Sequence, residues 1–178
     1  MKKNFILGLL AIIMMFAASC EQQELTPNLG SEAMVSFNVA TPQIATKAYS
    51  GGTTATKLQY AVYDAEGNIL GDLTKTNETI NGSATVKLPL VTGNKYSVIF
   101  WAAAEDAPYT VDFVAKTMTV DYTRVSSNNE KLDAFYKYHT FTVNGAQTET
   151  IELKRPFAQL NIGTADYAAS TSAGYTPT

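Results

Sequence analysis

The sequence has one cysteine, Cys20, one histidine, His139, and few charged residues. A single cysteine excludes a disulfide within the chain. With one histidine and no second cysteine, metal sites of the common nitrogen and sulfur type are excluded, and we expect no metal and no cofactor. Charged residues make up 16% of the chain and the formal net charge is -3. Without a basic excess, we expect no nucleic acid as a partner.

The apolar run near the N-terminus, Phe5–Phe16, is about 12 residues long, whereas a membrane-spanning helix needs about 20. It follows two lysines and precedes three small residues that lead into Cys20. This order is typical of a signal peptide, and the segment before the cysteine resembles a bacterial lipobox. We therefore predict that residues 1–19 are a signal peptide. Cys20 is expected to carry a membrane lipid on its thiol, with residues 20–33 as a tether.

The rest of the chain has few helix-forming residues and many Tyr, Thr, Val and Phe residues, which favours a β-protein. From residue 34, apolar and polar residues alternate in short segments, such as the one with Val35, Phe37 and Val39. Turn sequences separate these segments at a spacing of roughly 8–12 residues. The pattern predicts an all-β fold, an antiparallel β-sandwich, over residues 34–155.

Some segments allow more specific predictions. The mostly apolar run 96–104 predicts a central strand with both faces covered. Asn81-Gly82 predicts a two-residue hairpin that joins residues 78–80 to residues 84–90. The one plausible helix covers residues 129–136. The residues that we expect in or near the core are Tyr60, Val62, Leu88, Val98, Trp101 and either Ile99 or Phe100.

Pro156 interrupts a strand-like stretch, residues 148–163, and proline cannot donate to a strand ladder. We interpret this stretch as a crossover, with one strand ending near Leu153 and another beginning near Phe157. Residues 156–178 are then the incomplete start of a second β-domain. The sequence is expected to be the N-terminal part of a longer protein.

The sequence evidence for a catalytic site is weak, so we expect that the protein is not an enzyme. His139 has no serine in a G-x-S-x-G context to act with, and is interpreted as structural or surface-exposed. Asp64–Asn68 faintly matches a calcium loop but lacks the distal glutamate, and is interpreted as a turn. Glu105–Asp106 is a pair of carboxylates for which solvation is the simpler explanation. Tyr136 and Tyr138 are candidates for sugar stacking, although tyrosines more often line a sheet surface.

Three stretches resemble the fimbrillin-like lipoproteins of Bacteroidota, the subunits of type V pili: ATKAYSGGTTATKLQYAVYD (45–64), NKYSVIFWAAAEDAPYTVDF (94–113) and ELKRPFAQLNIGTADY (152–167). The basic pair followed by Pro-Phe-Ala in the third stretch is the most distinctive. The resemblance implies two tandem transthyretin- or immunoglobulin-like sandwiches, with this chain holding the N-terminal domain of a truncated two-domain fimbrillin. It also implies a pilus subunit or fimbria-associated adhesin, anchored in outer-membrane lipid through Cys20, with other pilus subunits as partners.

The resemblance further implies assembly by strand exchange. In the family, a trypsin-like protease cuts behind the first strand, which is then replaced by a strand of the next subunit. Here the replaced residues would be Val35, Phe37 and Val39, and the cut would fall between Lys47 and Ala48. Lys57 is a second choice. Anchor and tip subunits of such pili keep their first strand, so Lys47 as an ordinary loop lysine remains open.

A second class of function is also open. A surface lipoprotein that does not polymerise, and that binds a glycan or another host or bacterial surface ligand, would carry the same lipid signal. A complete reading frame, with its C-terminal strands, would separate the two classes.

The lipid signal gives the first testable prediction. Replacing Cys20 with alanine removes the only thiol in the chain, so labelling of cells with a fatty-acid analogue should no longer mark the protein. The variant should also leave the membrane fraction. A Cys20→Ala protein that still takes up label and stays with the membrane would contradict the lipobox assignment.

Overall fold

The structure is a computed structural model that describes residues 30–42, 54–126, 129–157 and 172. Nearly all of the regular structure in these residues is β-strand, with three short 3-10 turns. The elements are β1 (Glu32–Ala40), β2 (Lys57–Tyr63), η1 (Gly71–Leu73), β3 (Lys75–Thr79), β4 (Ser83–Val91), β5 (Lys95–Ala103), β6 (Tyr109–Asp112), β7 (Thr117–Val120), η2 (Tyr122–Arg124), η3 (Glu130–Leu132), β8 (Ala134–Thr142) and β9 (Gln147–Glu152).

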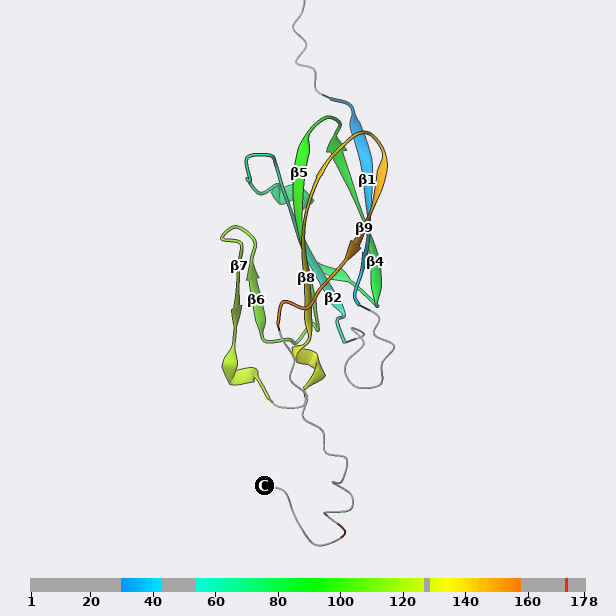
Figure 1. Cartoon of the computed structure of the whole chain (residues 1–178). Coiled ribbons are helices and arrows are strands. Elements are labelled where there is room, and N and C mark those ends of the chain that lie inside the picture. Colours follow the sequence, from blue (N-terminus) through cyan, green and yellow to red (C-terminus); the bar gives the residue numbers. More distant parts are fainter. Residues whose placement is uncertain (1–29, 43–53, 127–128, 158–171, 173–178) are drawn as a thin grey trace, which may run out of the picture.

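The strands form a sandwich of two sheets with a separate hairpin at its side (Figure 1). One sheet has the order β4-β1-β9 and the other has the order β3-β2-β5-β8, while β6 pairs only with β7. All pairs are antiparallel except β1 with β9, which run parallel. The predicted all-β sandwich is confirmed, with this one parallel pair as an addition to the antiparallel pattern.

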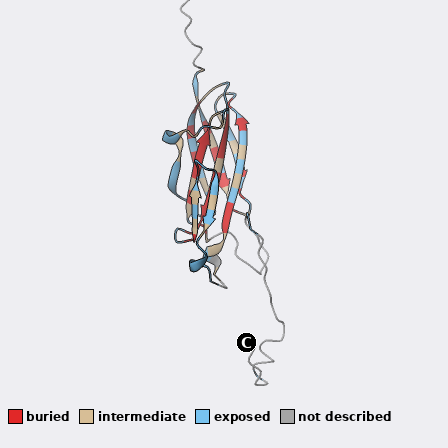
Figure 2. Cartoon of the chain, turned by 90° about the vertical axis from the view of Figure 1, so that its left-hand side faces the viewer, coloured by how far each residue is buried: buried red, intermediate tan, exposed pale blue. Residues whose placement is uncertain are grey.

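The core lies between the two sheets and consists of buried residues from both of them (Figure 2). All five residues of β3, at the edge of the larger sheet, are exposed. Most of the predicted core residues belong to this cluster, and Phe100 rather than Ile99 faces inward. Fully buried side chains come from both sheets, so neither sheet could stay folded without the other. They include Val35, Phe37, Val39, Leu58, Val62, Val98, Phe100 and Phe135.

The strand β5 is central and covered on both faces, as its apolar sequence predicts. Its inner face joins the core, and its outer face lies under the β6–β7 hairpin. Trp101 is therefore buried, with 5% of its surface exposed, but it belongs to the outer cluster and not to the sandwich core. Its position is near the core and not in it, and the sequence left this open because period-2 alternation cannot say which face of a doubly covered strand meets which layer.

The hairpin is fastened to the sheet at its tip. The Tyr63 hydroxyl donates to the Phe113 carbonyl over 2.7 Å, and burial raises the pKa of Tyr63. Lys116 has a positive φ of 55° and places its ammonium 4.5 Å from the centre of the Tyr63 ring. The same ammonium donates to the Gly67 carbonyl over 3.2 Å. These contacts hold the hairpin against β2.

The turn at Asn81-Gly82 does not close a hairpin. The strand β3 pairs with β2 in one sheet, and β4 pairs with β1 in the other. Gly82 adopts a φ of 70°, and the turn carries the chain from one sheet to the other. The sequence correctly indicated a turn at this point. The sheet to which β4 belongs is set by its pairing with β1 over nine residue pairs.

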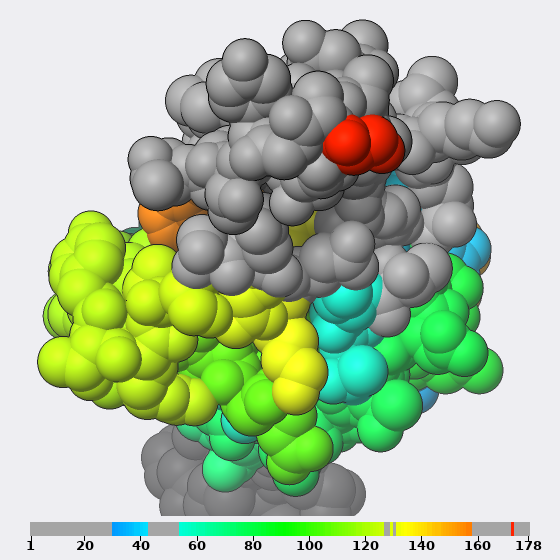
Figure 3. Space-filling model, turned by 90° about the horizontal axis from the view of Figure 1, so that it is seen from below, coloured from blue at the N-terminus to red at the C-terminus, as the bar shows by residue number. Residues whose placement is uncertain are grey.

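The predicted helix at residues 129–136 is also wrong. A single 3-10 turn, η3, occupies residues 130–132, and β8 begins at Ala134. Phe135 and the tyrosines that follow suit a strand, and Phe135 is fully buried. The segment with η2 and η3 (yellow-green) and the start of β2 (cyan) lie at the same end of the sandwich (Figure 3).

The last described strand ends at Glu152, which agrees with the predicted end near Leu153. Lys154 then forms a bridge with Tyr136 of β8, so the chain crosses from one sheet to the other at this point. The predicted second domain lies mostly outside the described residues and stays a prediction. In the part of the chain that the structure describes, no helix has the length and apolar character needed to cross a membrane.

The burial of Trp101 predicts a large effect on stability. Trp101→Ala should lower the free energy of unfolding by about 3–5 kcal/mol, because it empties a buried aromatic site. Tyr122→Ala is the matched control, since Tyr122 is 79% exposed and should change stability by less than about 0.5 kcal/mol. Denaturant titration followed by circular dichroism measures both. Equal losses for the two variants would place Trp101 at the surface.

Candidate functional site

The first strand, β1, is the candidate site. Along its whole length it pairs antiparallel with β4, from Glu32 opposite Val91 to Ala40 opposite Ser83. On its other edge it pairs parallel with β9, over residues 35–40. Since β4 and β9 do not pair with each other, β1 is the strand that holds this sheet together.

The inward face of β1 consists of Val35, Phe37 and Val39, and all three are fully buried. The structure thus brings the three predicted groove residues together on one face. Alternation places them there, because successive side chains of a strand point to opposite faces. Met34 is on the other face and is 48% exposed.

Phe37 fills the middle of the site and is surrounded by aromatic rings. Its ring centroid lies 5.2 Å from that of Phe141, 5.6 Å from that of Phe100 and 6.5 Å from that of His139. The contacts with Phe141 and His139 are edge-to-face, which is a favoured geometry for aromatic pairs. The surrounding strands therefore form a slot with a pocket for one large ring at its centre.

Backbone contacts fix both ends of β1. Ahead of the strand, the Thr92 N–H donates to the Ser31 carbonyl over 3.0 Å. A Cβ at Gly30 would lie 2.3 Å from the Thr92 carbonyl oxygen, so this close approach requires glycine. At the other end, the Leu153 N–H donates to the Ala40 carbonyl over 2.9 Å.

His139 joins the two sheets beside the slot. Its Nε2 atom lies 3.3 Å from a carboxylate oxygen of Glu149, so the contact links β8 to β9. The two side chains are 24% and 28% exposed. The His139 ring stacks on Phe141, and Glu149 also accepts a hydrogen bond from Gln147. This placement agrees with the structural role predicted for His139.

Three predicted site residues, Cys20, Lys47 and Ala48, lie outside the described residues. The lipid anchor and the cleavage site therefore stay predictions. Lys57, the second choice for cleavage, is the first residue of β2 and is half-buried.

The minor candidates from the sequence have ordinary surroundings. Asp64 accepts hydrogen bonds from the backbone and side chain of Asn68 and so closes a turn. Asp106 binds Lys131 over 2.7 Å, and that hydrogen bond lowers the pKa of the carboxyl. Tyr138 is exposed on the outer face of β8. Among the described residues, no three His, Cys, Asp or Glu side chains gather where they could hold a metal ion.

An ion pair that the sequence reasoning missed fastens the end of the described chain. Arg155 donates to both carboxylate oxygens of Asp133, over 2.7 and 2.6 Å, and these bonds raise the pKa of the guanidinium. The guanidinium also lies 5.1 Å from the centre of the Phe135 ring. The basic pair before Pro156 was noticed in the sequence, but its partner lies 22 residues away, which no local pattern indicates.

Comparison with solved structures finds distant likenesses. A proposed polysaccharide-binding protein (DUF1812) of Bacteroides thetaiotaomicron has 21% identity and a TM-score of 0.46, over 70% of this chain and 48% of that one. The fimbrial anchor protein Mfa2 of Porphyromonas gingivalis has 14% identity and a TM-score of 0.46, over 70% and 50%. A fimbrial assembly protein of Parabacteroides distasonis has 18% identity and a TM-score of 0.36, over 70% and 52%.

The chain thus spans about half the length of each of these three proteins. At such TM-scores the likenesses carry no argument about what the chain binds. No curated protein matches the chain. A family model matches residues 26–176, which include all described strands. The chain therefore belongs to a family of unknown function, DUF6562.

Proposed function

We propose that the protein is a structural subunit of a cell-surface pilus or an adhesin associated with one. It is exported as a lipoprotein and held in the outer membrane through Cys20. It acts by binding other subunits and not by catalysis. Its assembly step is exchange of β1 for a strand of another subunit.

The observation that carries this proposal is the position of β1. A strand that lies between β4 and β9 and covers the core leaves a defined slot when it departs. An incoming strand would gain backbone hydrogen bonds from both neighbours, and its alternate side chains would fill the pockets of Val35, Phe37 and Val39. Affinity would come from the backbone and specificity from the pockets.

Energetics explain why β1 would be exchanged and not simply lost. Burying a Val or Phe side chain is worth about 1.5–3 kcal/mol, so an empty slot would forfeit about 5–9 kcal/mol from three residues alone. This loss is comparable to the whole stability of a typical domain, about 5–15 kcal/mol. A replacement strand must therefore enter as β1 leaves.

Chain connectivity supports the same step. The strand β1 ends at Ala40 and β2 begins at Lys57, so a cut between Lys47 and Ala48 would separate β1 from the rest of the sandwich. After such a cut, only non-covalent contacts would retain β1.

Sequencing the N-terminus tests the cleavage. Mature protein purified from surface appendages should begin at Ala48. Lys47→Gln should block this processing, because a trypsin-like protease needs a basic residue before the cut, while Lys57→Gln should leave it unchanged. A blocked, lipidated Cys20 in polymeric material would contradict strand exchange and would indicate a subunit that keeps its first strand.

Exchange itself can be measured on nicked protein. After cleavage at Lys47, a labelled peptide with the sequence of residues 32–40 should replace β1 slowly. Phe37→Ala in the protein should speed the release of β1 at least tenfold, because it removes contacts worth about 3–5 kcal/mol. Ser36→Ala is the matched control, since Ser36 lies on the other face of the strand. Equal rates for both variants would show that the Phe37 pocket does not retain the strand.

A further inference from the structure

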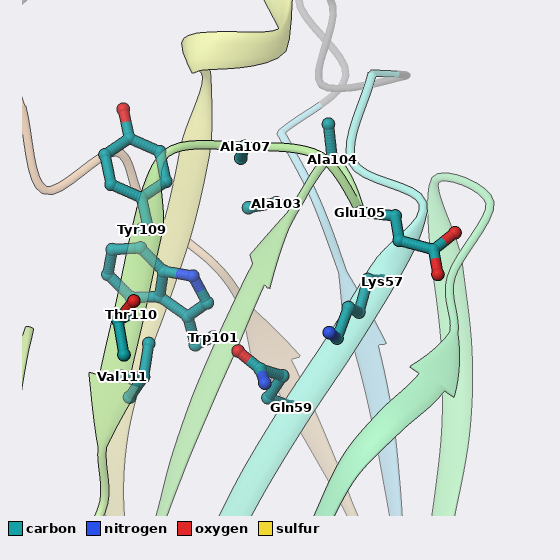
Figure 4. A pocket seen from close by; sticks show the side chains of 10 residues that line it. All are labelled: Lys57, Gln59, Trp101, Ala103, Ala104, Glu105, Ala107, Tyr109, Thr110 and Val111. Atoms are coloured by element: carbon teal, nitrogen blue, oxygen red, sulfur yellow. The ribbon is translucent and has the colours of Figure 1, made fainter. Parts of the chain in front are cut away.

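A cleft lies on the outer face of the larger sheet, on the side away from β1. Its volume is about 240 Å³. It opens between β2 and the β6 strand of the hairpin, with β5 as its floor (Figure 4). The side chains that matter for the argument are Lys57, Gln59, Trp101, Glu105 and Thr110.

The cleft contains hydrogen-bond donors without partners. Trp101 is 5% exposed, and its indole N–H has no acceptor among the described residues. Lys57 is half-buried and makes no ion pair within the described part of the chain. Neither donor atom is fully buried, so each is open to an acceptor that enters the cleft.

The arrangement of the charges favours an anion. Figure 4 shows the Lys57 ammonium and the Gln59 amide turned towards Trp101, whereas the Glu105 carboxylate points away from them. The Gln59 amide nitrogen is engaged with the Thr76 carbonyl over 3.0 Å, which holds this side chain in place. The lining of the cleft thus includes one cation, Lys57, one neutral donor, Trp101, and one carboxylate, Glu105, which is turned away from the other two.

Packing makes the cleft rigid. The Trp101 ring packs edge-to-face on Tyr109, with 5.6 Å between ring centroids, and the Tyr109 hydroxyl donates to the Leu132 carbonyl. Trp101 and Gln59 lie on paired strands, opposite each other in the register of β2 and β5. Sites built on strands keep their geometry better than sites on loops.

We propose that this cleft binds the carboxylate of a single acidic sugar residue, a hexuronate. The ammonium of Lys57 and the indole N–H of Trp101 hold the carboxylate, and charge-assisted hydrogen bonds of this kind are the strong ones. The Gln59 carbonyl and the Thr110 hydroxyl face the ring hydroxyls.

Size and lining favour a sugar over a larger ligand. The volume of about 240 Å³ is below the roughly 300 Å³ at which pockets begin to hold drug-sized molecules. Three alanines also line the cleft: Ala103, Ala104 and Ala107. Their methyl groups offer apolar contacts to the C–H face of a small ring and leave room for that ring. This site does not depend on the exchange of β1, because it lies on the opposite face of the other sheet.

Trp101 is the only tryptophan in the chain, so its fluorescence reports directly on the cleft. Titration of the full chain with galacturonate should give a saturable change, with a dissociation constant on the order of 1 mM. Neutral galactose should bind at least tenfold more weakly. Raising the salt concentration should weaken galacturonate binding and leave galactose unaffected.

Variants separate the cleft from the rest of the surface. Lys57→Gln should weaken galacturonate binding at least tenfold, while Lys95→Gln, which removes the same charge from an exposed position outside the cleft, should not. Circular dichroism checks that both variants fold. Equal affinity for galactose and galacturonate, no effect of Lys57→Gln, or no binding would overturn the proposal. Equally tight binding of N-acetylglutamate would overturn its assignment to a sugar.

Discussion

The strand β1 has two structural roles. It supplies the hydrogen bonds that join β4 to β9, and it fills the middle of the core with Val35, Phe37 and Val39. A three-stranded sheet has only one central strand, so both roles fall to β1. The smaller sheet is therefore intact only while β1, or another strand in its place, lies between β4 and β9.

The two sheets of the sandwich differ in what lies on them. The smaller sheet is organised around β1, whereas the larger sheet has an outer face covered by the β6–β7 hairpin. Tyr63 and Trp101 anchor that hairpin from β2 and β5, and the cleft opens along the edge of the cover. Assembly through β1 and binding in the cleft would thus use different faces, and one need not disturb the other.

Features set by side-chain alternation could be predicted from the sequence, and features set by distant pairing could not. The inward face of β1 and the central position of β5 follow from local patterns. The hairpin expected across Asn81-Gly82 and the helix expected at residues 129–136 were wrong, because the pairing of β4 and of β8 depends on strands far away in the chain. The cleft was missed for the same reason, since Lys57, Trp101 and Thr110 share no local motif.

The parallel pairing of β1 with β9 limits how the slot can be used. A parallel pair is slightly less stable per residue than an antiparallel one, and here it covers six residue pairs against nine with β4. The β9 edge is therefore the weaker side, and the contact between His139 and Glu149 lies beside it. Because β4 and β9 run in opposite directions, a strand between them is antiparallel to one and parallel to the other whichever way it runs. A strand that runs in the direction of β1 has its antiparallel pairs on the β4 side, where nine residue pairs form, and this direction makes the most of the more stable kind of pairing.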